Sequence, residues 1–257
     1  MRNKSTSKID AELKLEIGSH QVSFHISVDA GPTSPATLLE FVQEFTDKVV
    51  QIGIEDSIND GKSISCKKGC GACCAQLVPV TEIEIRHIAS LIKYLPRPTK
   101  LAVMERFEQA REKLQAAGFW QRLFDPRAID LENSNELSLS YFELGINCPF
   151  LVDESCSIHA DRPIACREYL VTSDAAFCKN PRAGNIDGVS IPIRLSTIFG
   201  RLCEEDTNHH ADWAPLIVAP YWQAAFPALP SKKTGQQWVE LFLGRLTKST
   251  KSSTAES

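Results

Sequence analysis

The stretch CKKGCGACC, residues 66–74, holds four of the nine cysteines of this chain within nine residues. Gly69 and Gly71 let the backbone turn tightly enough for several sulfur atoms to face one point. Two residues separate Cys70 from Cys73, which is the spacing of a metal-chelating knuckle. The stretch therefore predicts a group of soft metal ligands on a tight turn.

A second group of cysteines follows at wider spacing, with 7, 9 and 11 residues between its members. Thiolates favour zinc, Cu(I) and iron–sulfur clusters over hard cations. Eight thiolates could saturate two tetrahedral zinc ions, or hold one four-cysteine iron–sulfur cluster with cysteines to spare. The predicted metal ligands are Cys66, Cys70, Cys73, Cys74, Cys148, Cys156, Cys166 and Cys178.

The segment from Asn147 to Arg182 is rich in cysteine, proline, aspartate and serine and has no helical or strand periodicity. A segment of this length needs a source of order other than its own core. Metal binding supplies one, because its free energy offsets the chain entropy that folding removes. Two other interpretations stay open. Disulfides are disfavoured in a reducing compartment, and a role as small buried apolar residues suits only one or two thiols, such as Cys203.

The composition is that of a globular protein. The 257 residues carry a net charge of −4, and 43% of them are hydrophobic, which permits a core and excludes wholesale disorder. A mildly acidic chain is a poor candidate for binding nucleic acid through charge alone. No apolar run approaches the ~18 residues of a membrane span, and no apolar signal core follows residues 1–8. We therefore expect a cytoplasmic protein without nucleic-acid or membrane binding, and the sequence indicates no particular protein partner.

Periodic patterns predict a mainly helical α+β protein. Alternating apolar residues on both sides of Gly18-Ser19-His20 predict a small β-hairpin over residues 13–28. Ser34-Pro35 predicts a helix start, and Thr81 with Glu84 predicts a capping box at the start of another helix. Further helices are predicted over residues 99–117 and 136–144, and around residues 238–246.

The expected architecture is an irregular cysteine-rich metal-binding region packed among helices, with the β-hairpin at the N-terminus. A polar composition predicts loose chain at both ends. The expected segments are a flexible N-terminus at 1–12, a hairpin and helix at 13–59, a cysteine-cluster metal-binding domain at 60–182, a C-terminal extension at 183–247 and a disordered tail at 248–257.

Several charged side chains lie next to the cysteines in the sequence. Arg162 and Arg167 flank Cys166, so we expect them to donate hydrogen bonds to the metal ligands. Lys67 and Lys68 are equally consistent with a supporting role and with plain solvation at the surface.

The histidines give a weaker signal. His159 follows Cys156 by three residues and could be a nitrogen ligand or a structural residue. His87 is expected to be structural. A hard-metal site is disfavoured, and a solvated loop expected, for Asp206, His209, His210 and Asp212.

Short motifs accompany the two cysteine groups: Cys66 to Cys74, Cys148-Pro149-Phe150-Leu151, Cys156-Ser157-Ile158-His159, Arg162-Pro163 and Cys166-Arg167. This combination, over roughly residues 60–180, resembles the CxxCxxCC family, also called the YkgJ-like cysteine cluster family. The resemblance implies a domain that chelates zinc or iron. One departure from the family pattern is that three residues, not two, separate Cys66 from Cys70.

A related cysteine cluster in the flagellin lysine methylases implies an alternative, an iron–sulfur-dependent protein-modifying enzyme. The chain has no G-x-G-x-x-G motif for a conventional methyl donor. Cys66, Cys70 and Cys73 have the C-x3-C-x2-C spacing of radical adenosylmethionine enzymes, but no alternating strand–helix pattern follows. A third class, an interaction protein with a metal staple, predicts a large exposed apolar patch. The sequence indicates no catalytic residue.

Overall fold

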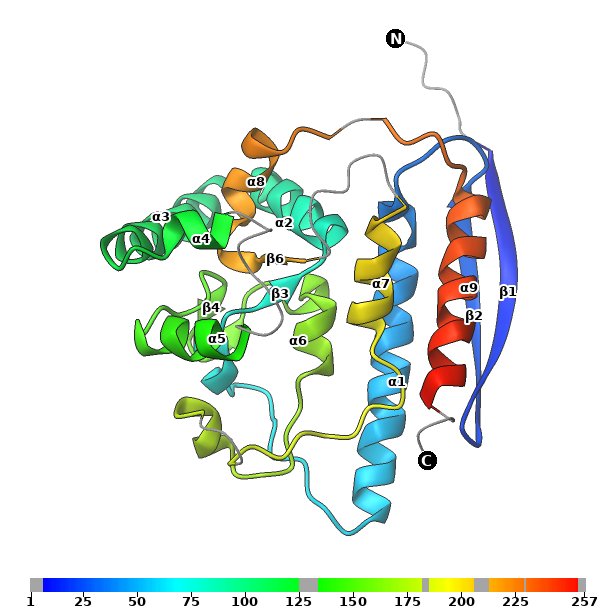
Figure 1. The fold of residues 1–257 in the computed structure, drawn as a ribbon, viewed down its shortest axis with the longest axis horizontal. Helices are drawn as coiled ribbons and strands as arrows, with labels where there is room; N and C mark the ends of the chain where they lie inside the picture. Colours follow the sequence, from blue (N-terminus) through cyan, green and yellow to red (C-terminus); the bar gives the residue numbers. More distant parts are fainter. Residues whose placement is uncertain (1–6, 125–133, 182–184, 206–212, 229, 254–257) are drawn as a thin grey trace.

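The computed structural model describes residues 7–124, 134–181, 185–205, 213–228 and 230–253. They form a mainly helical protein with a small antiparallel hairpin at its N-terminus, which confirms the expected fold class (Figure 1). The strands are β1 Lys8–Ile17, β2 His20–Asp29, β3 Pro79–Val80, β4 Leu151–Val152, β5 Ser155–Cys156 and β6 Ala214–Pro215. The α-helices are α1 Leu39–Asn59, α2 Glu82–Tyr94, α3 Arg97–Ala116, α4 Trp120–Phe124, α5 Ser134–Glu143, α6 Ile164–Glu168, α7 Leu195–Cys203, α8 Ala219–Ala225 and α9 Gly235–Ser253. The 3-10 helices are η1 Pro35–Leu38, η2 Ala72–Ala75, η4 His159–Asp161, η5 Ala175–Lys179 and η6 Leu216–Val218.

The N-terminal hairpin is longer than the sequence predicts. Its two-residue turn lies at Gly18-Ser19, where Gly18 has a φ of +59°, and the register runs from Ile17 opposite His20 to Lys8 opposite Asp29. Residues 8–12, expected to be flexible, belong to β1. The physical reason is that the alternation of apolar and charged residues already begins at Ile9.

The first core joins the two ends of the chain. Residues of β2, η1, α1, α7 and α9 form one buried cluster on the right of Figure 1. The Phe242 ring of α9 lies 5.7 Å from that of Phe41 and 6.4 Å from that of Phe45, both on α1. Trp238 donates its indole N–H to the Thr33 carbonyl at 2.9 Å. The C-terminal helix therefore completes the core that the hairpin and the first helix begin.

The C-terminal end of α9 differs from the sequence-based expectation. The α9 backbone remains helical to Ser253, beyond the point at which the disordered tail was expected to begin. Residues 254–257 lie outside the described residues.

Within the described residues, no helix is long and apolar enough to cross a membrane.

The second core lies on the left of Figure 1 and is built mainly from α2, α3 and α8. Its largest fully buried side chains are Trp222, Phe107 and Phe150, and the rings of the two phenylalanines meet edge to face at 5.6 Å. The short strands β3 and β6 pair antiparallel beside it, although well over a hundred residues separate them in sequence. This core therefore combines helices of the cysteine region with a segment from the C-terminal extension.

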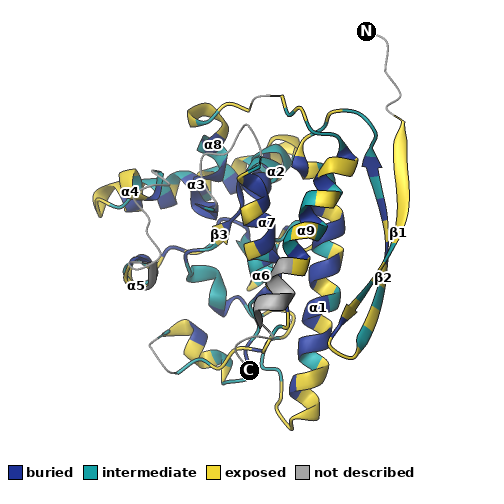
Figure 2. Cartoon of the chain, turned by 45° about the vertical axis from the view of Figure 1, so that its right-hand side comes forward, coloured by how far each residue is buried: buried dark blue, intermediate teal, exposed yellow. Residues whose placement is uncertain are grey.

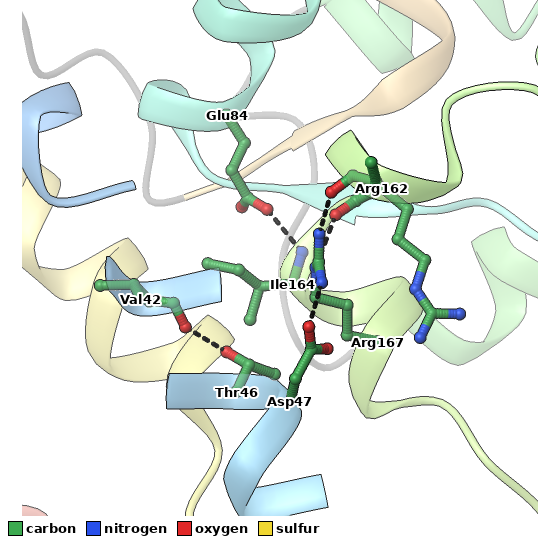
Figure 3. A network of polar contacts seen from close by, with 8 residues as sticks. Val42, Thr46, Asp47, Glu84, Arg162, Ile164 and Arg167 are labelled. Atoms are coloured by element: carbon green, nitrogen blue, oxygen red, sulfur yellow. Dashed lines mark hydrogen bonds and ion pairs between the residues drawn. The ribbon is translucent and has the colours of Figure 1, made fainter. Parts of the chain in front are cut away.

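Buried carboxylates connect the helices that surround the cysteines. The capping box predicted at α2 is confirmed, with Glu84 accepting from the Thr81 N–H at 2.9 Å. The other oxygen of Glu84 accepts from the Ile164 N–H, the first of α6, at 2.7 Å (Figure 3). At the far end of α6, Glu168 accepts from the N–H and hydroxyl of Ser196 at the start of α7. Two carboxylates thus fix α6 between α2 and α7.

Replacement of Glu84 by alanine should lower the free energy of unfolding by roughly 2–6 kcal/mol, because two buried amides lose their acceptor at about 1–3 kcal/mol each. Glu84→Gln keeps one carbonyl oxygen and should lose less. Urea denaturation measures both values, with Glu105→Ala on the exposed face of α3 as the matched control. A Glu84→Ala protein as stable as that control would contradict the role assigned to this carboxylate.

Candidate metal centre

The first cysteine group lies on a tight turn followed by η2. The Cys70 N–H closes the turn by donating a hydrogen bond of 3.1 Å to the Lys67 carbonyl. Within this turn Gly69 adopts a φ of +82°. Gly71 is required for a different reason, because a Cβ atom there would lie 2.7 Å from Cδ1 of Leu151 on β4. One glycine therefore supplies a left-handed backbone and the other a close contact between the two cysteine groups.

The second group begins on the hairpin of β4 and β5. Asp153 and Glu154 form its two-residue turn with φ angles of 48° and 57°, the left-handed pair of a type I′ turn. The turn reverses the chain so that Cys156, on β5, returns toward Cys148. The Cys148 N–H donates to the Cys74 carbonyl at 2.6 Å, which joins the hairpin directly to η2.

The remaining two cysteines of the second group come from α6 and η5. Cys166 lies on α6, which the buried carboxylates hold in place. Cys178 lies on η5, which packs against η2. Between them, the Tyr169 hydroxyl accepts a hydrogen bond of 3.0 Å from the Gln76 side chain. The chain thus brings all four segments of the second group around the first group.

Four thiols form a mutually close set: Cys73, Cys148, Cys156 and Cys166. Every pair among them is close enough for the charge of one thiolate to raise the pKa of another. Burial is the largest cause of the raised pKa of both Cys166 and Cys148. We call these residues the four-thiol set.

Three further thiols form a second set near Cys73. Cys66, Cys70 and Cys178 pack around Ala72 and Val171, and the Val171 N–H donates to the Cys66 sulfur at 3.4 Å. Each pair among these three cysteines interacts electrostatically, and Cys73 acts on both Cys66 and Cys178. We call them the three-thiol set. Cys73, a member of the four-thiol set, therefore also adjoins the three-thiol set. Cys74 follows it in the sequence.

Burial favours the protonated form of the two thiols Cys148 and Cys166. It raises the pKa of Cys148 to about 12 and that of Cys166 well above the ordinary value. The pKa of Cys73 is raised first by a hydrogen bond with the Cys74 thiol and then by burial. In the ranges that the structure describes, no group of three or more His, Cys, Asp and Glu side chains is arranged to hold a metal ion.

Arg167 does not have the role that the sequence predicts. Its buried guanidinium donates to the Asp47 carboxylate on α1 at 2.6 Å, to the Arg162 carbonyl at 3.0 Å and to the Ala160 carbonyl, as Figure 3 shows. These contacts fasten the loop before α6 to α1. Arg167 thus positions the segment that carries Cys166 rather than donating to a sulfur atom.

Arg162 places a positive charge near the thiols, while its buried Nε atom has no hydrogen-bond partner among the described residues. Its charge lowers the pKa of Cys66, Cys73 and Cys156, opposing the effect of burial. The charge of Arg162 is also the largest cause of the lowered pKa of His159. Burial lowers that pKa further. The guanidinium of Arg162 therefore favours the thiolate form of cysteines in both thiol sets.

The other candidate side chains lie apart from the cysteines or pair elsewhere. Cys203 is 2% exposed in the first core, where its thiol donates to the Phe199 carbonyl, so its prediction as a buried apolar residue is confirmed. His87 lies 3.4 Å from the Asp161 carboxylate, in agreement with a structural role. Asp206, His209, His210 and Asp212 lie outside the described residues.

Comparison with known families agrees with this geometry. Residues 65–184 match the family model CxxCxxCC, described as "Putative zinc- or iron-chelating domain". The cysteine-rich region is similar to this family. The match includes every cysteine of both groups and excludes Cys203. No curated protein and no solved structure matched the chain.

Metal binding to the cysteine-rich region should release protons, because buried thiols with raised pKa values must ionise to become ligands. We expect the apparent zinc affinity to rise between pH 6.5 and pH 8. Calorimetry in buffers of different ionisation enthalpy measures the protons released. An affinity that stays constant over this pH range would show that these thiols are not the ligands.

Proposed function

We propose that this protein binds zinc or an iron–sulfur cluster through cysteine thiolates of its CxxCxxCC domain. The observation that carries the proposal is the gathering of both cysteine groups around Cys73, from segments more than 70 residues apart in sequence. Thiolate chemistry suits both candidates, and the family description includes zinc and iron. Loading the site requires the thiol side chains to rotate toward a common centre.

The proposed division of the ligands follows the two sets. The four-thiol set supplies a complete tetrahedral sulfur site for zinc, or the four cysteines of one iron–sulfur cluster. The three-thiol set, with Cys74 as its fourth member, supplies a second site. Cys73 adjoins both sets, so its replacement should disturb both sites.

Serine variants test this division. We expect Cys166→Ser to reduce the metal bound by the four-thiol set, Cys178→Ser to reduce that bound by the three-thiol set, and Cys73→Ser to reduce both. Metal content per chain is measured by mass spectrometry, and thermal unfolding is followed with and without a chelator. Cys203→Ser is the matched control, since Cys203 lies in the first core. Equal metal content in all four variants would refute the ligand assignment.

The identity of the metal is decided by purification without oxygen. Iron with acid-labile sulfide and a brown absorption band would establish a cluster, whereas two zinc ions per chain without colour would establish two thiolate zinc sites. A folded protein that contains neither, and that takes up neither on reconstitution, would contradict the proposed function.

A further inference from the structure

The outer strand of the N-terminal hairpin, β1, has one unpaired edge. Within the described residues β1 pairs with β2 alone, and in Figures 1 and 2 it lies at the margin of the molecule, exposed along most of its length. The helices α1 and α9 pack on β2. The apolar row of β1 is therefore incompletely covered, and Ile9 remains 36% exposed.

The hairpin register determines which backbone groups face outward. The Ala30 N–H donates to the Ser7 carbonyl at 2.8 Å, and Ile17 lies opposite His20 across the two-residue turn. Hydrogen-bonded pairs alternate along an antiparallel ladder, so odd-numbered residues of β1 face β2. The N–H and C=O groups of the even-numbered residues 8–16 then point to the open edge. These residues are Lys8, Asp10, Glu12, Lys14 and Glu16.

An open edge invites a further strand, and charged residues on it usually prevent that. The effect of these charges depends on which side chains lie opposite them on the added strand. If β1 pairs antiparallel with β1 of a second copy and Glu12 lies on the two-fold axis, Lys8 faces Glu16 and Asp10 faces Lys14. Each of these opposite-charge pairs occurs twice, and Glu12 opposite Glu12 is the single like-charge pair. Opposite charges directly across an antiparallel pair are favourable.

Neighbouring registers are less favourable. With Ala11 on the axis, Lys8 faces Lys14 and Asp10 faces Glu12, so every charged pair is of like sign. With Leu13 on the axis, favourable pairs of Glu12 with Lys14 are matched by unfavourable pairs of Asp10 with Glu16. If one strand were shifted along the other by an odd number of residues, the apolar side chains of one copy would lie on the polar face of the other copy.

We propose that β1 is a homodimerisation strand, which pairs antiparallel with β1 of a second copy about an axis at Glu12. The dimer has a continuous sheet in the order β2, β1, β1 of the partner, β2 of the partner. On its apolar face Ile9 meets Leu15 and Ala11 meets Leu13, each pair twice, which extends the first core across the axis. The hairpin packs in the first core, on the opposite side of the molecule from the cysteines (Figure 1). Dimerisation through β1 therefore does not depend on a bound metal.

Charge reversal tests the register on the full chain. Sedimentation equilibrium of the wild type should give a dimer. Lys14→Glu converts two favourable pairs into two like-charge pairs, and should raise the dimer dissociation constant roughly tenfold or more. The double variant Asp10→Lys with Lys14→Asp exchanges the charges within each pair and should restore the dimer. Lys113→Glu, the same charge change on the exposed surface of α3, is the matched control and should leave the dimer unchanged.

Amide hydrogen exchange gives a second readout. The amides of Asp10, Glu12 and Lys14 should gain protection as protein concentration rises, and those of Lys14→Glu should not. A wild-type protein that is monomeric up to high micromolar concentration would overturn the proposal. A dimer that Lys14→Glu leaves intact would also overturn it, because that dimer must use another surface.

Discussion

Glu84 accepts one hydrogen bond from the first turn of its own helix and one from the first residue of α6. The second bond joins residues 80 positions apart and is completely buried. Burial raises the pKa of this carboxyl, and the hydrogen bonds from Ile164 and Thr81 oppose that shift. The arrangement persists because the cost of burying the group is offset by donors that would otherwise be unsatisfied at two helix starts. The position of Cys166 therefore depends on Glu84.

The short segments that carry the cysteines contribute few residues to the two larger cores. Among the described residues, a small buried cluster of Ala72, Val171 and Cys178 lies beside Cys66 and Cys70, while Cys148 and Cys156 pack against the second core. These segments are connected to the rest of the molecule through Phe150 in the second core and through the Arg167–Asp47 ion pair with α1. The thiols are thus held near one another by elements that pack for reasons independent of metal. A bound metal would add bonds between thiolates of the two cysteine groups to the Cys148–Cys74 backbone hydrogen bond.

The segments on either side of the family match form part of the same structure. The helix α9 and the hairpin share the first core, and β6 and α8 complete the second. Gly235 illustrates how close this packing is, since a Cβ atom there would lie 2.4 Å from the Asp29 carbonyl oxygen. The segments before and after the family match therefore pack into the same two cores as the helices of the matched region, and we propose that one of these segments, the hairpin, extends the assembly to a second copy.

Several features could be predicted from the sequence because their physical cause is local. The four thiols of residues 66–74, the capping box at Thr81, the helix start at Ser34-Pro35 and the Gly18-Ser19 turn each depend on residues a few positions apart. The strand β1 begins earlier than the hairpin predicted over residues 13–28, although apolar and charged residues alternate from Ile9 onward. Other features required the tertiary structure. The second role of Glu84, the contact of Arg167 with Asp47 and the division of the thiols around Cys73 join residues far apart in sequence. Spacing shows which side chains can bind a metal, whereas the packing of two cores decides which of them meet.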